Sequence, residues 1–265
     1  MKSSSSSLHG FFLPNREVKN DAEKMCEITA DYYEEFFKEP INIYRPHPYT
    51  DAPDVEWNNY DEKIPLASLD EVLDIVRSRR KKKSCDSHGL SNYMFNSLPP
   101  SYWSILVQII NHSFSDAIVP KKWKDTRILL LAKKEPICHP VSTCPISLLD
   151  VFLRVNEKLF LCRFSDILKR RDILTDTKSG FREDFRLQTR VLLFFEQVSS
   201  LMANSSPVAT IFVDFKAAFD QLWFEGCIGK LKRLGIPKDY LRWIDTWLTG
   251  RRAYIEIAGK KIPLV

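Results

Sequence analysis

Residues 209–220 of this 265-residue chain read Ala-Thr-Ile-Phe-Val-Asp-Phe-Lys-Ala-Ala-Phe-Asp. The first seven are mostly β-branched, aromatic or small apolar residues, which predicts a short buried strand over 209–215. Asp214 interrupts this run near its end. A buried carboxylate needs a partner that offsets its desolvation, and a metal ion, an arginine or the N–H groups of a helix start would each serve. The stretch therefore predicts either a metal-binding acid or a structural one.

Residues 213–220 resemble motif A of the reverse transcriptases of non-LTR (LINE-type) retrotransposons. Other parts of the chain match the same family in the same order: 119–124 with 127–134, 145–149, 157–159 with Arg163 and Phe164, 179–182, and several positions between 230 and 252. The similarity begins near Lys83 and extends over the rest of the sequence. Six matches in the right order are far more specific than any one of them.

The resemblance implies an α/β (α+β) fold that comprises the fingers and the first half of the palm of a right-hand polymerase. We expect an acidic, helical and partly disordered N-terminal arm and linker over 1–65, followed by a partial reverse transcriptase domain over 66–265. It also implies an RNA-directed DNA polymerase whose partners are an RNA template, a DNA primer and deoxynucleotide triphosphates.

Such polymerases use two Mg²⁺ ions, held by carboxylates, to activate the primer hydroxyl and the incoming triphosphate. By resemblance Asp214 would bridge both ions and the Phe215 carbonyl would be a backbone ligand. Phe219 would be the steric gate that excludes a ribose 2′-hydroxyl, with ordinary packing in the palm as the alternative. Asp220 is better explained as a helix N-cap than as a ligand. The predicted nucleotide-binding residues are Lys133, Ala217, Ala218 and Phe219.

Two positions depart from the family pattern. Cys144 stands where the family has an arginine that clamps the triphosphate, and Lys178 stands where it has a glutamine. The sequence contains no Asp-Asp dipeptide, the motif that supplies the other metal-binding carboxylates. We therefore expect a chain truncated after motif A that does not polymerise by itself, because one carboxylate cannot hold two ions.

Charge is distributed unevenly along the chain. Residues 1–62 contain 13 acidic residues and 6 Lys or Arg, a net −7, and the remainder contains 21 and 33, a net +12. A basic body suits a polyanionic partner, although it could be only a solvated surface. The alternative function is therefore a non-catalytic, basic nucleic-acid-binding module. The predicted nucleic-acid contacts are Arg79, Arg80, Lys81, Lys82, Lys121, Lys122, Lys124, Arg127 and Arg182.

The basic run from Arg77 to Lys83 has two other interpretations. It could be a solvated helix end or a nuclear-import patch. The six cysteines form no Cys-x-x-Cys pair, so we expect reduced thiols and no disulfide-linked partner. No apolar stretch approaches the roughly 18 residues of a membrane span, and the start of the chain lacks the apolar core of a signal peptide. These features favour an intracellular protein, in the nucleus, the cytoplasm or both.

Local patterns predict most of the secondary structure. We expect disorder over 1–15, a helix over 17–38 ended by Pro40, and an extended linker over 39–65. Ser68 to Glu71 form a capping box that starts a helix. Further expected elements are a strand over 126–132, helices over 147–170, 187–202, 224–234 and 237–248, and a hairpin with strands 253–257 and 260–265.

Overall fold

The computed structural model describes residues 8–38, 59–80, 82–133, 135–175, 177–182, 185–204, 206–215, 218–220 and 222–264. The chain forms two compact units. Unit 1 comprises Met1–Phe164 with Gln221–Val265, and unit 2 comprises Ser165–Asp220. The expected boundary between an N-terminal arm and a polymerase domain near residue 65 stays a prediction.

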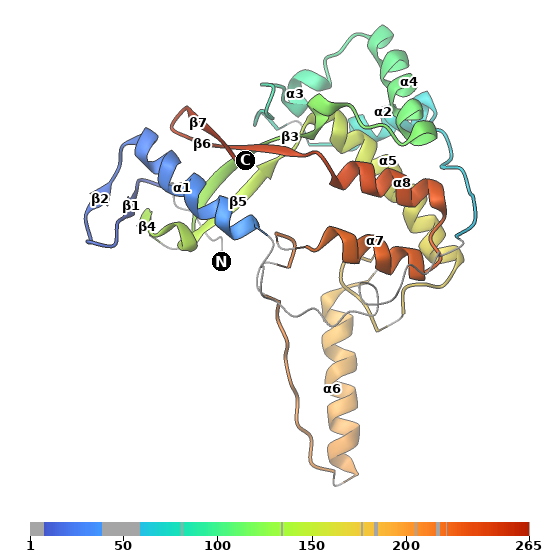
Figure 1. The fold of residues 1–265 in the computed structure, drawn as a ribbon. Helices are drawn as coiled ribbons and strands as arrows, with labels where there is room; N and C mark the ends of the chain where they lie inside the picture. Colours follow the sequence, from blue (N-terminus) through green and yellow to red (C-terminus); the bar gives the residue numbers. More distant parts are fainter. Residues whose placement is uncertain are drawn as a thin grey trace. The chain divides into compact units, whose positions relative to one another are not determined.

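A four-stranded mixed sheet in the order β5-β3-β6-β7 lies at the centre of unit 1 (Figure 1). Strand β3 (Asp125–Ala132) pairs antiparallel with β5 (Thr143–Leu148) and parallel with β6 (Arg252–Ile257), which forms a hairpin with β7 (Lys260–Leu264). Both residues of the hairpin turn, Ala258 and Gly259, have positive φ. Their conformation matches the twist of the two strands, so the predicted hairpin is confirmed.

The N-terminal segment packs on this sheet. Helix α1 (Ala22–Phe37) lies across β6 and β7, and a second sheet in the order β2-β1-β4 lies beside it (Figure 1). The three short strands are β1 (Gly10–Phe12), β2 (Val18–Lys19) and β4 (Ile137–Cys138). The prediction of disorder over 1–15 is therefore wrong for residues 10–12, whereas residues 1–7 lie outside the described part.

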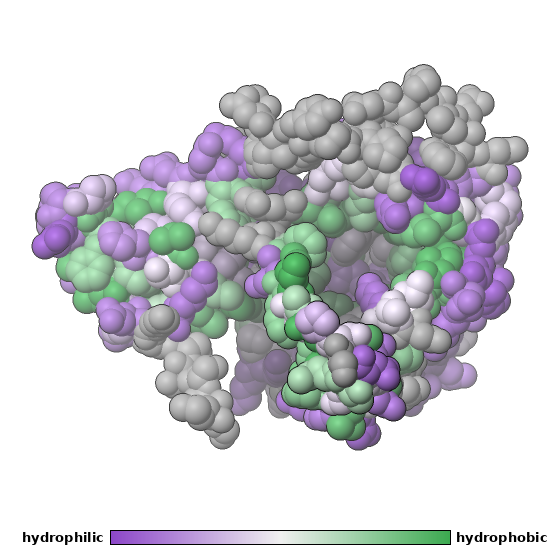
Figure 2. Space-filling model, turned by 90° about the horizontal axis from the view of Figure 1, so that it is seen from below, coloured by the Kyte–Doolittle hydropathy of each residue, from purple (hydrophilic) through white to green (hydrophobic). Residues whose placement is uncertain are grey.

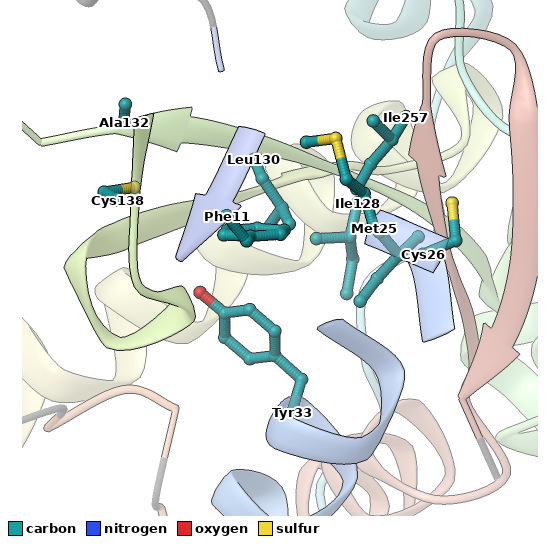
Figure 3. Packing of buried hydrophobic residues seen from close by; sticks show 10 residues of the cluster. Phe11, Met25, Cys26, Tyr33, Ile128, Leu130, Ala132, Cys138 and Ile257 are labelled. Atoms are coloured by element: carbon teal, nitrogen blue, oxygen red, sulfur yellow. The ribbon is translucent and has the colours of Figure 1, made fainter. Parts of the chain in front are cut away.

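A hydrophobic cluster joins the N-terminal segment to the central sheet. Phe11 of β1 and Met25 of α1 meet Ile128 and Leu130 of β3 in this cluster (Figure 3). The hydroxyl of Tyr33 lies 2.8 Å from Thr143 Oγ1, so a polar contact adds to the apolar packing. The acidic arm thus contributes core residues to the fold. Of the expected linker over 39–65, residues 39–58 lie outside the described residues.

Helix α4 (Pro100–Asp116) packs on α2 (Leu69–Ser78) and on α8 (Lys238–Leu248). Ser68 and Glu71 form the predicted capping box at the start of α2. Near the centre, Trp243 stacks on Phe160 at 3.8 Å and donates its indole N–H to Ser113. The helices are α2 (Leu69–Ser78), α3 (Asn92–Phe95), α4 (Pro100–Asp116), α7 (Phe224–Arg233), α8 (Lys238–Leu248) and α5 (Val151–Arg170), whose residues 165–170 belong to unit 2. The 3-10 turns are η1 (Lys121–Lys124) and η2 (Pro140–Ser142).

Unit 2 contains α6 (Leu187–Ala203) and an extended segment over 206–215, followed by a turn at 218–220. No described residue of α6 is buried. Apolar side chains of unit 2 therefore reach the surface, including Leu187, Leu192 and Phe195. Green, apolar residues are visible at the surface in Figure 2.

The mixed α/β class is confirmed, and α6, α7 and α8 lie close to the predicted bounds, whereas α3 and α4 were not predicted. Two helices were placed too early. Val18 and Lys19 form β2, and α1 begins at Ala22 rather than at residue 17. Ser147 and Leu148 belong to β5, and α5 begins at Val151. In the parts of the chain with described structure, no helix has the length and apolar character needed to cross a membrane.

Candidate functional site

The motif A segment is extended but is not a strand. Residues 206–215 pair with no described strand, and Ile211, Phe212 and Phe215 are largely exposed. The prediction of a buried strand over 209–215 is therefore wrong for this structure. An apolar run becomes a central strand only where neighbouring strands satisfy its N–H and C=O groups, and the strands described here pair with one another.

Asp214 lies exposed in this segment. Its carboxylate has no hydrogen bond or ion pair with the residues that the structure describes. The two structural interpretations of this acid, a helix cap and an arginine partner, are thus not formed among those residues. Nor do the described residues gather three or more His, Cys, Asp or Glu side chains around a possible metal ion.

The described residues that follow Asp214 are also exposed to solvent. Phe215 is exposed, Ala217 lies outside the described residues, and Ala218 is exposed in the turn. Phe219 is 79% exposed, and the centroid of its ring lies 6.0 Å from the centroid of the Phe181 ring in a T-shaped arrangement. Ordinary core packing of Phe219 is therefore absent from the described structure.

Asp220 is not the cap of the next helix. Helix α7 begins at Phe224 and its N-cap is Trp223, so the predicted capping role of Asp220 is wrong.

The lysines of turn η1 differ in their exposure to solvent. Lys121 and Lys122 are exposed, whereas Lys124 is 8% exposed. Lys124 donates through Nζ to the carbonyl oxygens of Thr246 (2.6 Å) and Thr249 (2.9 Å), at the C-terminal end of α8. Burial, followed by repulsion from Arg251, lowers the pKa of Lys124. Its ammonium group is committed to the fold, which contradicts its predicted role as a phosphate contact.

Arg127 is also engaged internally. Its Nη2 pairs with Glu256 at 2.8 Å across β3 and β6, and its Nη1 donates to the Cys85 carbonyl at 3.4 Å. This arginine therefore links the sheet to the loop after α2, and a phosphate contact would require it to leave these partners.

The basic run after α2 does not continue the helix, because α2 ends at Ser78. Arg79 is the half-buried C-cap residue and donates to the Val151 carbonyl at 3.3 Å. Arg80 and Lys82 are exposed, and Lys81 lies outside the described residues. Arg80 and Lys82 are thus open to a polyanion and are not part of a helix end.

Two further predicted residues occupy loops. Lys133 is exposed just after β3, and its Nζ donates to the Val141 carbonyl at 3.3 Å. Arg182 donates to the carbonyls of Thr175 and Lys178, and its guanidinium lies 4.0 Å from the ring centre of Phe185. Lys133 belongs to unit 1, whereas Arg182 shares unit 2 with Asp214 but donates to other residues.

Comparison with known proteins identifies similar sequences. The chain is 26% identical over 95% of its length to "Probable RNA-directed DNA polymerase from transposon BS" and 27% identical over 94% to "RNA-directed DNA polymerase from mobile element jockey", both from Drosophila melanogaster. The resemblance to non-LTR retrotransposon reverse transcriptases is confirmed. "Probable RNA-directed DNA polymerase from transposon X-element" of the same species is 25% identical over 69% of the chain and 20% of that protein. No protein-family model matches the chain. It spans 28% of the length of the first two relatives.

Cys144 is the position where the resemblance to reverse transcriptases predicts an arginine. The structure places it on β5, exposed and opposite Leu131 of β3. The family arginine at this position would extend a guanidinium from the sheet, whereas a thiol cannot make that bidentate charged contact.

A buried acid near the start of the family resemblance was missed from the sequence. Asp86 is buried and accepts from the N–H groups of His88 and Leu90 through Oδ1, and from that of Val151 through Oδ2. The Asp-Ser-His-Gly sequence offered a signal, because an aspartate often caps its own turn. The hydrogen bond from the Val151 N–H group at the start of α5 could not be predicted from the sequence around Asp86.

Asp150, the second missed acid, lies at the start of α5. It is buried and accepts from the N–H groups of Phe152 and Leu153 through Oδ1. Burial raises its pKa to about 6, the helix N–H groups oppose this shift, and the nearby Asp86 adds to it. Together Asp86 and Asp150 hold the first turn of α5 against the loop after α2.

Proposed function

We propose that this chain is part of an RNA-directed DNA polymerase in which Asp214 is a metal ligand. The observation that carries the proposal is the exposed carboxylate, without a described partner, in the segment that matches motif A. The order of the matching stretches and the similarity to transposon polymerases support it. An acid without an internal partner is free to bind a cation.

The described residues do not fit a complete two-ion site. Mg²⁺ requires several oxygen ligands in octahedral geometry, and no group of three candidate ligands occurs in the part of the chain that the structure describes. Asp214 and the Phe215 carbonyl would be two ligands, and the 265 residues alone are expected to be inactive.

Phe219 is proposed as the residue that selects the sugar. It lies five positions after Asp214 in the sequence and its ring is exposed, so it is available to contact a bound nucleotide. In an active polymerase carrying this segment, Phe219→Val should admit ribonucleotides while preserving deoxynucleotide incorporation. Equal loss of both activities would contradict the sugar-selecting role.

The primary test is primer extension on an RNA template with the 265-residue chain and its Asp214→Asn variant. We expect no Mg²⁺-dependent incorporation from either protein. Grafting residues 206–220 into a related active polymerase should preserve extension, and Asp214→Asn in the graft should abolish it. An active graft with asparagine at this position would exclude Asp214 as a metal ligand.

The alternative is a non-catalytic nucleic-acid-binding module, favoured by the exposed cations Arg80, Lys82, Lys121 and Lys122. Changing all four to Gln should weaken binding to single-stranded RNA and flatten the salt dependence of affinity by about 0.7 for each phosphate that is no longer neutralised. Matched changes of Lys238 and Lys260, which are exposed elsewhere on unit 1, should have a smaller effect. An unchanged slope would assign the four cations to a solvated surface.

A further inference from the structure

A surface pocket between α2 and α5 has no role in the proposed polymerase chemistry. It has a volume of about 390 Å³ and is lined by Ile75, Ser78, Arg79, Leu149, Arg154, Glu157, Lys158 and Leu161. All of these residues belong to unit 1. The volume lies toward the lower end of the range for small-molecule sites, about 300–1,000 Å³.

Cations dominate the charge of this pocket. Its lining contains three basic side chains, Arg79, Arg154 and Lys158, and one carboxylate, Glu157. The spacing follows from the helix: positions 154, 157, 158 and 161 recur on one face of α5. Arg79 enters from the end of α2 and is held by its bond to the Val151 carbonyl.

Glu157 is already engaged with other residues. Its Oε1 accepts from the indole N–H of Trp247 at 2.6 Å and lies 3.5 Å from Nη2 of Arg251, outside the pocket lining. Burial raises the pKa of Glu157, while Trp247 and Arg251 oppose this shift. The one acidic group among the described lining residues is therefore shared with a cation that the pocket does not contain.

Two of the three pocket cations lack side-chain partners among the described residues. Arg154 and Lys158 form no side-chain hydrogen bond or ion pair with residues in the described ranges. Burial lowers the pKa of Arg79, repulsion from Arg154 adds to this effect, and attraction to Glu157 opposes it. Two guanidinium groups that repel each other in a half-buried position are stabilised by an anion that bridges them.

We propose that this pocket binds a phosphate group, carried by either a nucleic-acid backbone or a free nucleotide. Guanidinium groups match phosphate oxygens in geometry, and Lys158 adds a third positive charge. Ile75, Leu149 and Leu161 supply an apolar wall for the sugar or base beside the phosphate. The pocket residues lie far from Asp214 in the sequence, and phosphate binding there needs no metal. Only the assignment of the phosphate to a nucleic-acid backbone rests on the proposed function.

The test measures binding by the 265-residue chain in a buffer containing a chelator. The two probes are a deoxynucleoside triphosphate, followed by calorimetry, and a labelled short oligodeoxythymidine, followed by fluorescence anisotropy. The variants are Arg154→Gln and Lys158→Gln, and Lys260→Gln on β7 is the matched control. Glutamine preserves helix propensity, and the altered residues have no described side-chain partners, so both pocket variants should fold normally.

We expect each pocket variant to bind at least one probe about tenfold more weakly than the control, as for removal of a charged hydrogen bond. Weakening confined to the triphosphate identifies a free nucleotide as the source, and weakening of the oligonucleotide identifies a backbone phosphate. Affinities equal to those of Lys260→Gln for both probes would overturn the proposal. Because no extension is measured, that result would leave the role of Asp214 unaffected.

Discussion

Lys124 tests whether a buried basic residue stabilises the fold and does not contact nucleic acid. Replacing it with Met keeps the aliphatic stem that packs in the fold and removes the ammonium group. The change leaves the carbonyls of Thr246 and Thr249 without the donor that closes the end of α8. The exposed Lys122, two residues earlier in the same turn, provides a matched control.

The expected cost follows from the two bonds. Hydrogen bonds to charged groups contribute about 1.5–3 kcal/mol each. Removing the buried charge recovers some desolvation energy, and Thr249 is exposed, so water can reach its carbonyl. We therefore expect Lys124→Met to lower the free energy of unfolding by about 2–4 kcal/mol, whereas Lys122→Met should change it by less than about 0.5 kcal/mol.

Urea unfolding followed by circular dichroism measures the change in the free energy of unfolding. The salt dependence of single-stranded RNA binding measures whether each lysine contacts a phosphate. Lys122→Met should flatten the salt slope by about 0.7, and Lys124→Met should leave it unchanged while the protein is folded. The opposite pattern, with Lys124→Met as stable as the parent and deficient in binding, would refute the structural role of Lys124.

Two further substitutions test individual side chains. The pKa of Asp150 rises from 3.8 to about 6 on folding, so its ionisation costs stability increasingly as pH rises through this window. Asp150→Asn keeps the cap acceptor and should stabilise the protein by about 3 kcal/mol at pH 8 and by about half as much at pH 5. A stability difference that does not change with pH in urea unfolding would contradict the raised pKa. Phe219→Ala should change the free energy of unfolding by less than about 0.5 kcal/mol because the ring is exposed, and a decrease of about 3–5 kcal/mol would show that the ring is a core residue.

Local signals predicted the elements that depend on local contacts. The capping box at Ser68 and Glu71 satisfies N–H groups of its own helix, so four residues are enough to place the start of α2. The turn at Ala258 and Gly259 likewise requires only its own backbone conformation. Both features could be derived without knowledge of any distant residue.

Features that depend on distant partners were missed or misplaced. The apolar pattern of 209–215 predicts a buried strand, but burial requires neighbours that the described strands do not provide. The N-terminal segment was expected to be an arm, yet Phe11 and Met25 complete a cluster with residues more than one hundred positions away. Its acidic composition indicates solvation of one helix face and says nothing about the packing of the other.

The same distinction limits what net charge says about nucleic-acid binding. Lys124 and Arg127 direct their charges to internal partners, and Arg79 is half-buried beside Val151. The predicted contacts that remain exposed in unit 1 outside the Lys133 loop are Arg80, Lys82, Lys121 and Lys122. If each of these four meets one phosphate, the salt slope should be about 3 on single strands. A steeper slope would require additional phosphate contacts, and Arg154 and Lys158 of the α2–α5 pocket, without side-chain hydrogen bonds or ion pairs among the described residues, are two cations that could make them.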